Sequence, residues 1–324
     1  MQPSPYRILG FLLLIFLGFY WTQHQPPWGD WVRLSAGPIL RPTTNEFESA
    51  GVFNPAVVKR GNEFVMIYRA QDKNGTSRLG YATSLDGIHF NRRTKPLLEP
   101  ATDYEQGGGL EDPRLVKIND TYYLTYTGFN KKDAQLCLAT SQDLINWDRK
   151  GVILPANKGR WNVGWTKAGA ILPQKINGKY WMYFMADAAE RPNQMGVAYS
   201  SDLLQWQEPL DRPVLEGRPR HFDSYVVEPG PPPEMTKAGI LLVYNGADDR
   251  NVYATGWVLF DKMDPTKVLA RSVNPIFRVE KEWERIGQVP NVVFVQAMVR
   301  DGHRWLFYYG GADKFIGVAF ARPR

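Results

Sequence analysis

The sequence predicts an all-β fold, a five-bladed β-propeller preceded by an N-terminal apolar signal-anchor segment. A unit of about sixty residues recurs five times, and each copy contains several short alternating strands. The chain of 324 residues also contains 11 Trp, 16 Tyr, 16 Phe, 29 Gly and 24 Pro. This composition is typical of short strands and tight turns, and it argues against a fold of long helices.

The repeated unit begins with a polar or proline-containing entry into an alternating strand. A Tyr-rich strand follows, and a Ser-Asp hairpin then leads into a third strand. The five copies begin at residues 54, 112, 168, 228 and 290. One copy cannot bury both faces of its strands, whereas copies packed around an axis bury them against each other. A β-sandwich is the alternative, but its strands would not recur as one long block.

The two ends of the repeat array predict how the ring closes. The fifth copy stops after its third strand, at residues 316–320, and residues 32–40 form a spare strand before the first copy. We expect this spare strand to complete the last blade. Residues 28–324 are therefore predicted to form one propeller, the catalytic domain, and residues 1–27 a separate segment.

The N-terminal segment has the features of a signal sequence. Arg7 precedes an unbroken apolar run over residues 8–21, and a polar, proline-containing linker follows over residues 22–27. The run is shorter than the ~20 residues that span a bilayer, which favours a cleaved signal peptide. However, no small-x-small cleavage site follows, and the aromatic residues 19–21 are typical of a membrane interface. We therefore predict an uncleaved membrane anchor with the propeller outside the cytoplasm.

Composition argues against several other functions. The formal charge of +6 is spread along the chain without a basic block, so nucleic-acid binding is not expected. Cys137 is the only cysteine and lies in an apolar run, which predicts a buried, unreactive thiol. The four histidines are not spaced as metal ligands, so we expect neither a metal nor another cofactor. The sequence leaves the oligomeric state open.

The segment over residues 107–114 is the first candidate for chemistry. It joins a glycine run to Glu111, Asp112, Pro113 and Arg114 at the entry of the second copy. Glycine allows close approach of a ligand, Pro113 should hold Asp112 extended, and Arg114 offers a bidentate donor. A solvated polar turn is the alternative. In a propeller, however, all copy starts gather at one funnel, which would bring together Asn54, Asp112, Lys167, Glu228 and Asn291, flanked by Arg69, Arg114 and Glu284.

Several motifs resemble glycoside hydrolase family 130, whose members are five-bladed propellers acting on β-mannosides. Most of these members are phosphorylases and some are hydrolases. The resemblance extends from about residue 33 to residue 323. It is carried by Tyr68-Arg-Ala-Gln-Asp72, Gly109-Leu-Glu-Asp-Pro-Arg114, Gly230-Pro-Pro-Pro233, Val289-Pro-Asn-Val-Val-Phe294 and Tyr308-Tyr-Gly-Gly-Ala-Asp313.

The resemblance implies roles for individual residues. Asp112 would be the general acid, passing its proton through a hydroxyl of the mannosyl ring to the glycosidic oxygen. Arg69, Arg114 and Asp313 would hold the mannose, although both arginines could instead pair with Asp72 and Glu111. The full set of predicted substrate-binding residues is Asn54, Arg69, Ser77, Arg78, Glu111, Arg114, Lys167, Asn245, Asn291 and Asp313.

The chain departs from the phosphorylase pattern at the phosphate site. Val226 and Asn245 stand where that pattern has a phosphate-binding lysine and histidine, and Glu228 stands where it tends to have glycine. A carboxylate at that position would repel phosphate and could deprotonate water. Inversion by hydrolysis needs an acid and a base separated by about 6.5–9.5 Å. We expect Glu228 to be the base, with Glu284 as the alternative or helper, unless they form salt bridges with Lys167 or Arg285.

The sequence therefore predicts an inverting, exo-acting β-mannoside hydrolase. One alternative is a β-1,2- or β-1,4-mannoside phosphorylase that produces mannose 1-phosphate, with Lys167, Arg78 and Arg160 replacing the missing phosphate ligands. The other is a propeller that binds mannan without cleaving it, since aromatic-rich funnels also bind sugars. The linkage and the length of the substrate stay open.

Overall fold

The structure, a computed structural model, describes residues 26–324, and this part of the chain is almost entirely β. The all-β prediction is confirmed. The only helical segments among the described residues are short, namely η1 (Glu46–Glu48), η2 (Asp103–Glu105) and α2 (Glu282–Arg285).

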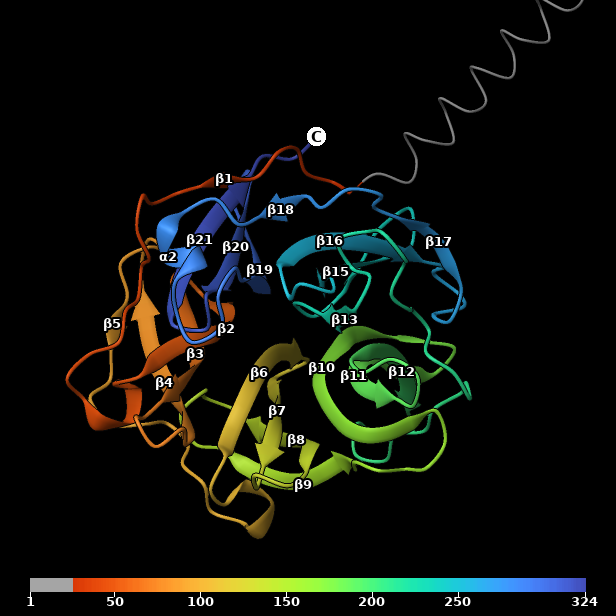
Figure 1. The fold of residues 1–324 in the computed structure, drawn as a ribbon, viewed down its shortest axis with the longest axis horizontal. Helices are drawn as coiled ribbons and strands as arrows, with labels where there is room; N and C mark the ends of the chain where they lie inside the picture. The colour runs from red at the N-terminus through yellow and green to blue at the C-terminus, as the bar shows by residue number, and fades with distance from the viewer. Residues whose placement is uncertain (1–25) are drawn as a thin grey trace, which may run out of the picture.

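The strands follow the five repeats (Figure 1). The first unit contains β2 (Gly51–Arg60), β3 (Glu63–Gln71), β4 (Ser77–Ser84) and β5 (Asn91–Arg92). The second contains β6 (Gly109–Ile118), β7 (Thr121–Phe129), β8 (Ala134–Ser141) and β9 (Asp148–Leu154). The third contains β10 (Asn162–Ile176), β11 (Lys179–Ala188) and β12 (Gln194–Ser200).

The last two units complete the chain. The fourth contains β13 (Val226–Pro229), β14 (Glu234–Met235), β15 (Ile240–Ala247), β16 (Tyr253–Phe260), β17 (Val268–Arg271) and β18 (Phe277–Arg278). The fifth contains β19 (Val293–Asp301), β20 (Arg304–Gly311) and β21 (Phe315–Ala321), together with β1 (Val32–Arg33).

The units are antiparallel sheets arranged around a common centre (Figure 1). The five units form four hydrogen-bonded sheets. The first two units count as one sheet because a single parallel residue pair, Ser77 and Gly109, joins them. No sheet closes on itself. We interpret the five units as the blades of a propeller, in which the ring is held by packing between sheets.

The hydrophobic cores lie between neighbouring units. Successive residues of a strand point to opposite faces, so Met66 packs with the fifth unit while Ile67 packs with the second. The same alternation continues around the ring, with interfaces that include Leu138 and Met182, Tyr183 and Leu242, and Val243 and Phe307. Each unit therefore buries both faces, one against each neighbour.

The spare N-terminal strand completes the fifth unit, as predicted. β1 pairs with β21, and Val32 lies opposite Phe320. Trp28, which is buried, forms a bridge to Pro323 and packs edge-on against Trp305 and Phe307. The two ends of the described chain therefore meet in the same unit.

The Ser-Asp hairpins are a repeated local structure. In the first three units a serine hydroxyl donates to an aspartate two residues later, in Ser84–Asp86, Ser141–Asp143 and Ser200–Asp202. The aspartate in turn accepts two backbone N–H groups, for example from Ile145 and Asn146. These turns satisfy backbone donors at the hairpin and have a structural role.

The first strands of the first two units bend at a β-bulge near the centre of the ring. Asn54 and Asp112 have φ of 48° and 51°, and the register shifts between Phe53 and Ala56 and between Glu111 and Arg114. The expectation that Pro113 holds Asp112 extended is therefore wrong. The bulge places one extra residue on the inner strand and turns its side chain into the funnel.

Other sequence predictions meet the structure only in part. Cys137 is fully buried, and burial raises the pKa of its thiol to about 12, which confirms the buried thiol.

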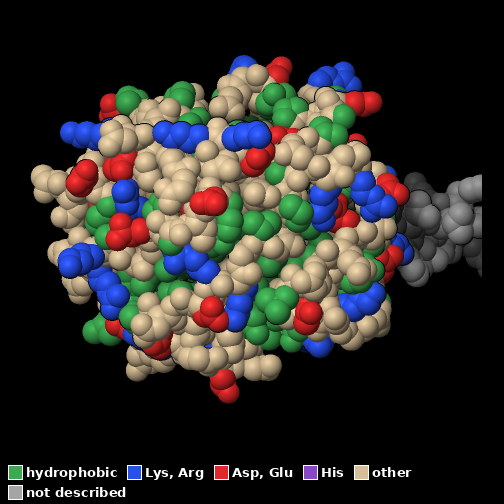
Figure 2. Space-filling view, turned by 90° about the horizontal axis from the view of Figure 1, so that it is seen from below, with side chains coloured by type: hydrophobic (Ala, Val, Ile, Leu, Met, Phe, Trp, Pro, Cys, Tyr) green, Lys and Arg blue, Asp and Glu red, His purple; other side chains and the backbone are tan. Residues whose placement is uncertain are grey.

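The signal-anchor prediction falls on residues that lie almost wholly outside the described part. Within residues 26–324, no helix has the length and apolar character needed to cross a bilayer. On the face shown in Figure 2, basic and acidic side chains are interspersed.

Candidate active site

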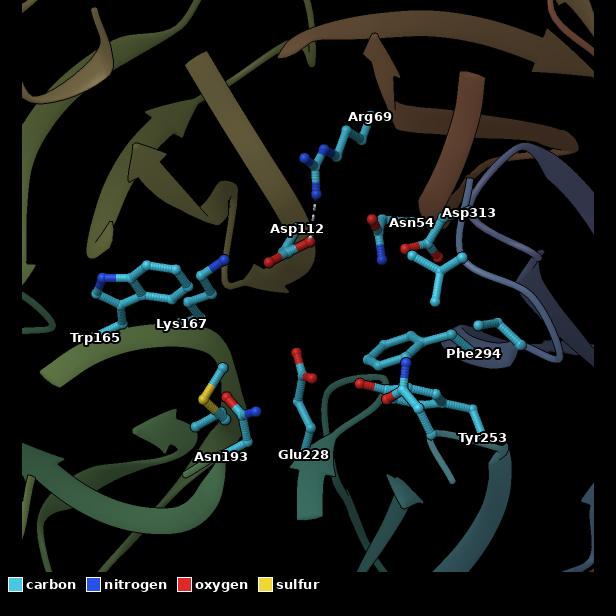
Figure 3. A pocket seen from close by; sticks show the side chains of 14 residues that line it. Asn54, Arg69, Asp112, Trp165, Lys167, Asn193, Glu228, Tyr253, Phe294 and Asp313 are labelled. Carbon is cyan, nitrogen blue, oxygen red and sulfur yellow. Dashed lines mark hydrogen bonds and ion pairs between the residues drawn. The ribbon is translucent and has the colours of Figure 1, made fainter. Parts of the chain in front are cut away.

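A pocket of about 270 Å³ opens at the centre of the ring (Figure 3). Its walls come from all five units, because the inner strands and their entry loops converge there. The lining residues are Asn54, Arg69, Asp112, Trp165, Lys167, Met185, Asn193, Glu228, Asn251, Tyr253, Val289, Val292, Phe294 and Asp313. Predicted functional residues from different repeats are thus brought together.

Asp112 and Glu228 face each other across this pocket (Figure 3). Asp112 projects from the bulge of β6 in the second unit, and Glu228 from β13 in the fourth. Both residues are largely buried, and 11% and 12% of their side-chain surfaces are exposed. Two carboxyl groups on opposite walls are the arrangement that acid–base cleavage of a glycosidic bond requires.

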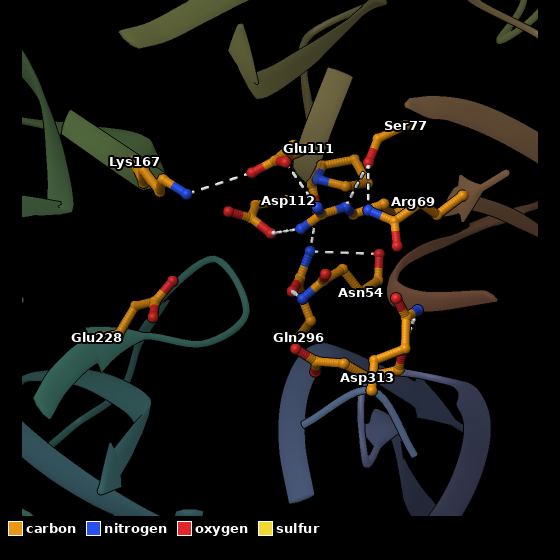
Figure 4. Close-up of polar contacts among 12 residues, drawn as sticks. Asn54, Arg69, Ser77, Glu111, Asp112, Lys167, Glu228, Gln296 and Asp313 are labelled. Carbon is orange, nitrogen blue, oxygen red and sulfur yellow. Dashed lines mark hydrogen bonds and ion pairs between the residues drawn. The ribbon is translucent and has the colours of Figure 1, made fainter. Parts of the chain in front are cut away.

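A charged network borders Asp112 (Figure 4). Arg69 donates to Glu111 at 2.6 Å and reaches Asp112 at 3.5 Å. Lys167 donates to the other oxygen of Glu111 at 3.2 Å, and Ser77 accepts from Nε of Arg69 at 2.8 Å. Glu111 therefore pairs with both pocket-lining cations, so Arg69 has an acidic partner within the site, whereas Asp72 pairs with Arg78.

Burial and mutual repulsion change the acidity of the pocket carboxyls. Burial, reinforced by Asp112, raises the pKa of Glu228 to about 7. Burial likewise raises the pKa of Asp313 to about 6, with Arg69 opposing and Asp112 adding to the effect. Burial lowers the pKa of Lys167, but Glu111 and Asp112 outweigh it, so that the pKa is raised overall. The pocket thus holds titrating acids beside a cation that stays charged.

Gln296 is a residue that the sequence reasoning missed. It is fully buried at a bulge of β19, beneath the pocket. Its side chain donates to the carbonyl of Pro113 at 2.6 Å and to that of Asn54 at 3.3 Å, and it accepts from the Asn54 amide at 2.7 Å. It thereby joins both bulges (Figure 4). Gln296 occupies the bulge of the fifth unit as Asn54 does that of the first, but copy starts at residues 54 and 290 do not align the two, so the repeats did not reveal this role.

Arg114 does not hold the sugar as predicted. Its guanidinium is buried below the pocket and donates to the carbonyls of Asp112, Pro229 and Gly230, at 3.0, 2.6 and 2.9 Å. The nearest guanidinium nitrogen lies 3.8 Å from Glu228. Arg114 therefore connects the backbone behind the second-unit acid to the backbone beside the fourth-unit acid.

Glu284 does not reach the pocket, so the prediction that it serves as the base is wrong. Its carboxylate is fully buried and is bonded by Arg33 at 2.7 Å and by the hydroxyl of Tyr309 at 2.9 Å. It also accepts the backbone N–H groups of residues 280 and 281. With these partners its oxygens are fully engaged in the structure.

The contacts of Glu284 belong to a repeated structural element. Four of the five units contain a buried tyrosine whose hydroxyl donates to a buried acid, which is also paired with an arginine. These sets are Tyr68–Glu48–Arg92, Tyr126–Glu105–Arg149, Tyr244–Asp223–Arg271 and Tyr309–Glu284–Arg33. The acid precedes each copy start by a similar number of residues, so this role was readable from the repeats.

The remaining predicted binding residues divide into two groups. Asn54, Arg69, Lys167 and Asp313 line the pocket, whereas Ser77 and Glu111 contact its charged network from behind. Arg78 instead pairs with Asp72 at 2.8 Å. Asn245 is fully buried and bonds Val295 and Thr255, and Asn291 is not among the lining residues. The expectations of direct substrate contact at these three positions are therefore not supported.

Aromatic and amide side chains that the sequence reasoning did not select also line the pocket. Trp165 is 37% exposed and lies beside Lys167, whose Nζ is 4.8 Å from the ring centroid. Tyr253 and Phe294 lie on the opposite side in Figure 3. Such walls suit the apolar faces of a sugar ring. Within residues 26–324, no group of acids, histidines or cysteine is arranged to hold a metal.

Comparison with known proteins shows the family. A family model described as beta-1,4-mannooligosaccharide phosphorylase, of glycoside hydrolase family 130, matches residues 24–323. The chain therefore belongs to this family, which confirms the resemblance found in the sequence.

Curated relatives include a 1,2-beta-oligomannan phosphorylase of Thermoanaerobacter sp. (strain X514), which is 44% identical over 298 residues. That match covers 89% of this chain and 95% of the relative. A beta-1,4-mannooligosaccharide phosphorylase of Ruminococcus albus is 30% identical over 304 residues, covering 89% of this chain and 87% of the relative. By their names, both of these relatives are phosphorylases.

Solved structures of similar proteins include glycosidases. A putative glycosidase from Bacteroides thetaiotaomicron has a TM-score of 0.84 and 36% identity, covering 92% of this chain and 99% of that chain. Another structure has a TM-score of 0.82 and 36% identity, covering 90% of this chain and 94% of that chain. That structure belongs to work reporting that the GH130 family of mannoside phosphorylases contains glycoside hydrolases that target beta-1,2 mannosidic linkages in Candida mannan.

Proposed function

We propose that this protein cleaves terminal β-mannosides in the pocket between Asp112 and Glu228, and that water accepts the mannosyl group. The observation that carries the proposal is the position of Glu228, a buried carboxyl across the pocket from Asp112. The family's β-mannoside-acting members support the substrate class. The β-1,2 linkage is the one named for a curated relative that is 44% identical and for one of the solved structures.

The charge balance of the pocket favours water over phosphate. The lining cations, Arg69 and Lys167, are both paired with Glu111. The lining acids are Asp112, Glu228 and Asp313. A phosphate dianion would enter a partly dehydrated site whose two cations already share ion pairs with Glu111, and it would meet several carboxyls. A neutral water molecule meets no such repulsion.

The proposed reaction assigns one proton transfer to each carboxyl. Asp112 supplies a proton, through a hydroxyl of the bound mannose, to the leaving glycosidic oxygen as its bond to the anomeric carbon breaks. Glu228 removes a proton from the water that attacks the anomeric carbon from the opposite face. The new carbon–oxygen bond forms with inversion, and mannose is released. Gln296 and the bulges close the floor, so the pocket takes a terminal residue.

Phosphorolysis is the second candidate, and the curated relatives are the observation in its favour. In that reaction phosphate would attack in place of water and yield mannose 1-phosphate. With a pKa of about 7, Glu228 is partly protonated at neutral pH, which would reduce its repulsion of phosphate. Binding of mannan without turnover has no comparable observation in its favour.

The acceptor is identified by incubating full-length protein with β-1,2-mannobiose in buffer with and without phosphate. We expect mannose at equal rates in both, and NMR of the first product should detect the α-anomer, as inversion of a β-mannoside requires. A strict requirement for phosphate, with mannose 1-phosphate as product, would replace the hydrolase by the second candidate. Undiminished product formation by Asp112→Asn would exclude both.

The cellular location is a separate proposal that comes from the sequence. Residues 1–27 would anchor the protein in a membrane, with the propeller outside the cytoplasm. The test compares full-length protein with a chain lacking residues 1–27 after membrane fractionation. The full chain should pellet with membranes and be cleaved by added protease in cells whose cytoplasm stays intact. Recovery of the full chain in the soluble fraction would contradict the proposal.

A further inference from the structure

A second, larger cavity lies beside the catalytic pocket. We call it the arginine groove, since Arg191, Arg220, Arg250 and Arg278 are among its lining residues. Its volume is about 810 Å³, and it lies along loops of the third and fourth units. The groove and the pocket share a chain segment, because Val252 lines the groove whereas its neighbours on both sides line the pocket.

The groove carries unpaired positive charge. Arg250 is neutralised by Asp248 at 2.7 Å, and Asp249 is the only other acid that lines the cavity. Among residues 26–324, the side chains of Arg220 and Arg278 have no acidic partner. Planar guanidinium groups bind phosphate and carboxylate oxygens through paired hydrogen bonds.

Arg191 is already held in position at the groove. Its Nη1 atom donates to the carbonyl of Gly217 at 3.0 Å, which fixes one side of the guanidinium and leaves its other donors available. A guanidinium held in this way loses less side-chain freedom on binding a ligand. Arg191 is also close in sequence to Asn193, which lines the catalytic pocket.

Aromatic side chains give the groove a surface suited to sugars. Tyr225 is 44% exposed and Phe222 also lines the cavity. Tyr225 precedes Glu228 by three residues, and an extended chain of that length spans on the order of 10 Å. The backbone of Tyr225 is fixed by a hydrogen bond from its N–H to the carbonyl of Ala247 at 2.9 Å. A substrate leaving the catalytic pocket on this side would therefore pass over Tyr225 into the groove.

We propose that the arginine groove binds an anionic group, a phosphate ester or a carboxylate, on the leaving-group side of the substrate. This inference rests on the proposed cleavage of β-mannosides. The two cavities differ in charge. The catalytic pocket is lined by three acids, and its two cations are both paired with Glu111, whereas the groove offers unpaired arginines. The neutral terminal mannose would enter the pocket, and the charged part of the glycan would extend into the groove.

The test compares a neutral and two anionic substrates of full-length protein. The probes are β-1,2-mannobiose, the same disaccharide with a 6-phosphate on its reducing mannose, and β-mannosyl-1,2-glucuronate. For Arg220→Ala and Arg278→Ala, kcat/KM should fall about tenfold or more for an anionic probe and stay within about twofold for mannobiose. Arg322→Ala is the matched control, because Arg322 is an exposed arginine outside the groove.

The two anionic probes separate the sources of the charge. A loss confined to the phosphorylated probe identifies a phosphate ester, and a loss confined to the glucuronate identifies a carboxylate. The advantage of the anionic probe should also decrease with rising salt, because ion pairing in an open groove is screened. Equal effects of the variants on all three probes, or no effect on any, would overturn the groove proposal.

Binding measurements separate this proposal from the proposed function. Calorimetry on the Asp112→Asn protein should detect binding of the phosphorylated or the glucuronate disaccharide. Adding the double substitution Arg220→Ala/Arg278→Ala to that protein should abolish this binding. Such binding without turnover by the native protein would reject the function and keep the groove. Turnover of neutral mannobiose, with anionic binding unchanged by the arginine substitutions, would reject the groove and keep the function.

Discussion

Arg114 lies 3.8 Å from Glu228 while donating to the backbone carbonyl of Asp112 at 3.0 Å. This one buried guanidinium therefore contacts both sides of the proposed acid–base pair. It also attracts the ionised form of Glu228, which lowers the pKa of that group against the effect of burial. The separation and the ionisation of the two carboxyls thus depend on a buried residue that does not line the pocket.

Arg114→Lys should alter the pH profile as well as the rate. Lysine keeps the charge, but its ammonium group cannot donate to all three carbonyls in the planar geometry of the guanidinium. The backbone beside both acids should therefore shift. We expect kcat to fall about 100-fold or more. Arg114→Met, which removes the charge, should also raise the pKa of Glu228. A pH–rate profile of both variants checks this, and an unshifted profile in Arg114→Met contradicts it.

The pH dependence of the native protein distinguishes a base from an acid at Glu228. A general base must be ionised, and burial raises the pKa of Glu228 to about 7. We therefore expect kcat/KM for mannobiose to rise with pH through about 7. The rise should be absent from the residual activity of Glu228→Gln. A rate that falls with pH through the same range would assign Glu228 as the acid.

The raised pKa of Glu228 also affects stability. Because the folded protein binds this proton more tightly than the unfolded chain, the contribution is present below about pH 4.5 and is lost as pH rises through about 7. Glu228→Gln removes the charge, so above pH 7 the variant should unfold at a higher temperature than the native protein. Thermal unfolding at about pH 5 and about pH 8 measures the difference. A native protein more stable than Glu228→Gln at the higher pH would contradict this prediction.

Glu284→Gln should act on stability instead of chemistry. The substitution leaves Arg33 without its buried counter-charge, which should cost about 3–5 kcal/mol. Glu105→Gln is a matched control, since Glu105 holds the equivalent position in the second unit. Both variants should unfold at lower temperatures, and the folded fraction should keep kcat within about twofold. A selective loss of kcat in Glu284→Gln would restore its assignment as the base.

Gln296→Leu should reduce turnover more than binding. The leucine leaves the carbonyl of Pro113 without its donor and frees the Asn54 bulge, so Asp112 loses its fixed position. We expect kcat to fall about tenfold to 100-fold with a smaller change in KM. Gln296→Glu is the companion variant, because it keeps the acceptor for Asn54 and loses the donor to Pro113. Equal kcat values for the native protein and both variants would exclude this positioning role.

Much of the architecture could be predicted from the sequence because it repeats. The copy starts identified the inner strands, the spare segment before the first copy became β1, and the Ser-Asp hairpins took the same form in three units. The convergence of Asp112 and Glu228 followed from that repetition. These features depend on local patterns and on packing that every unit shares.

The predictions for the Asp112 backbone and for Glu284 are wrong because both depend on contacts between distant segments of the chain. Pro113 alone suggests an extended Asp112, but the bulge there is left-handed, and Gln296, 183 residues further along the chain, donates to the carbonyl of Pro113. Glu284 was assigned to the funnel because its position near a copy start was considered without its partners. Its partner Arg33 is 251 residues away along the chain. Side-chain direction at such positions is decided by tertiary contacts.

The origin of the oxygen in the product tests the central claim most directly. Full-length protein is incubated with β-1,2-mannobiose in ¹⁸O-labelled water, and the released sugar is analysed by mass spectrometry before the label exchanges. Attack by water at the anomeric carbon predicts one ¹⁸O atom in the mannose from the non-reducing end and none from cleavage in the leaving mannose, in buffer without phosphate. Absence of cleavage until phosphate is added, with unlabelled mannose 1-phosphate as the product, would contradict the account.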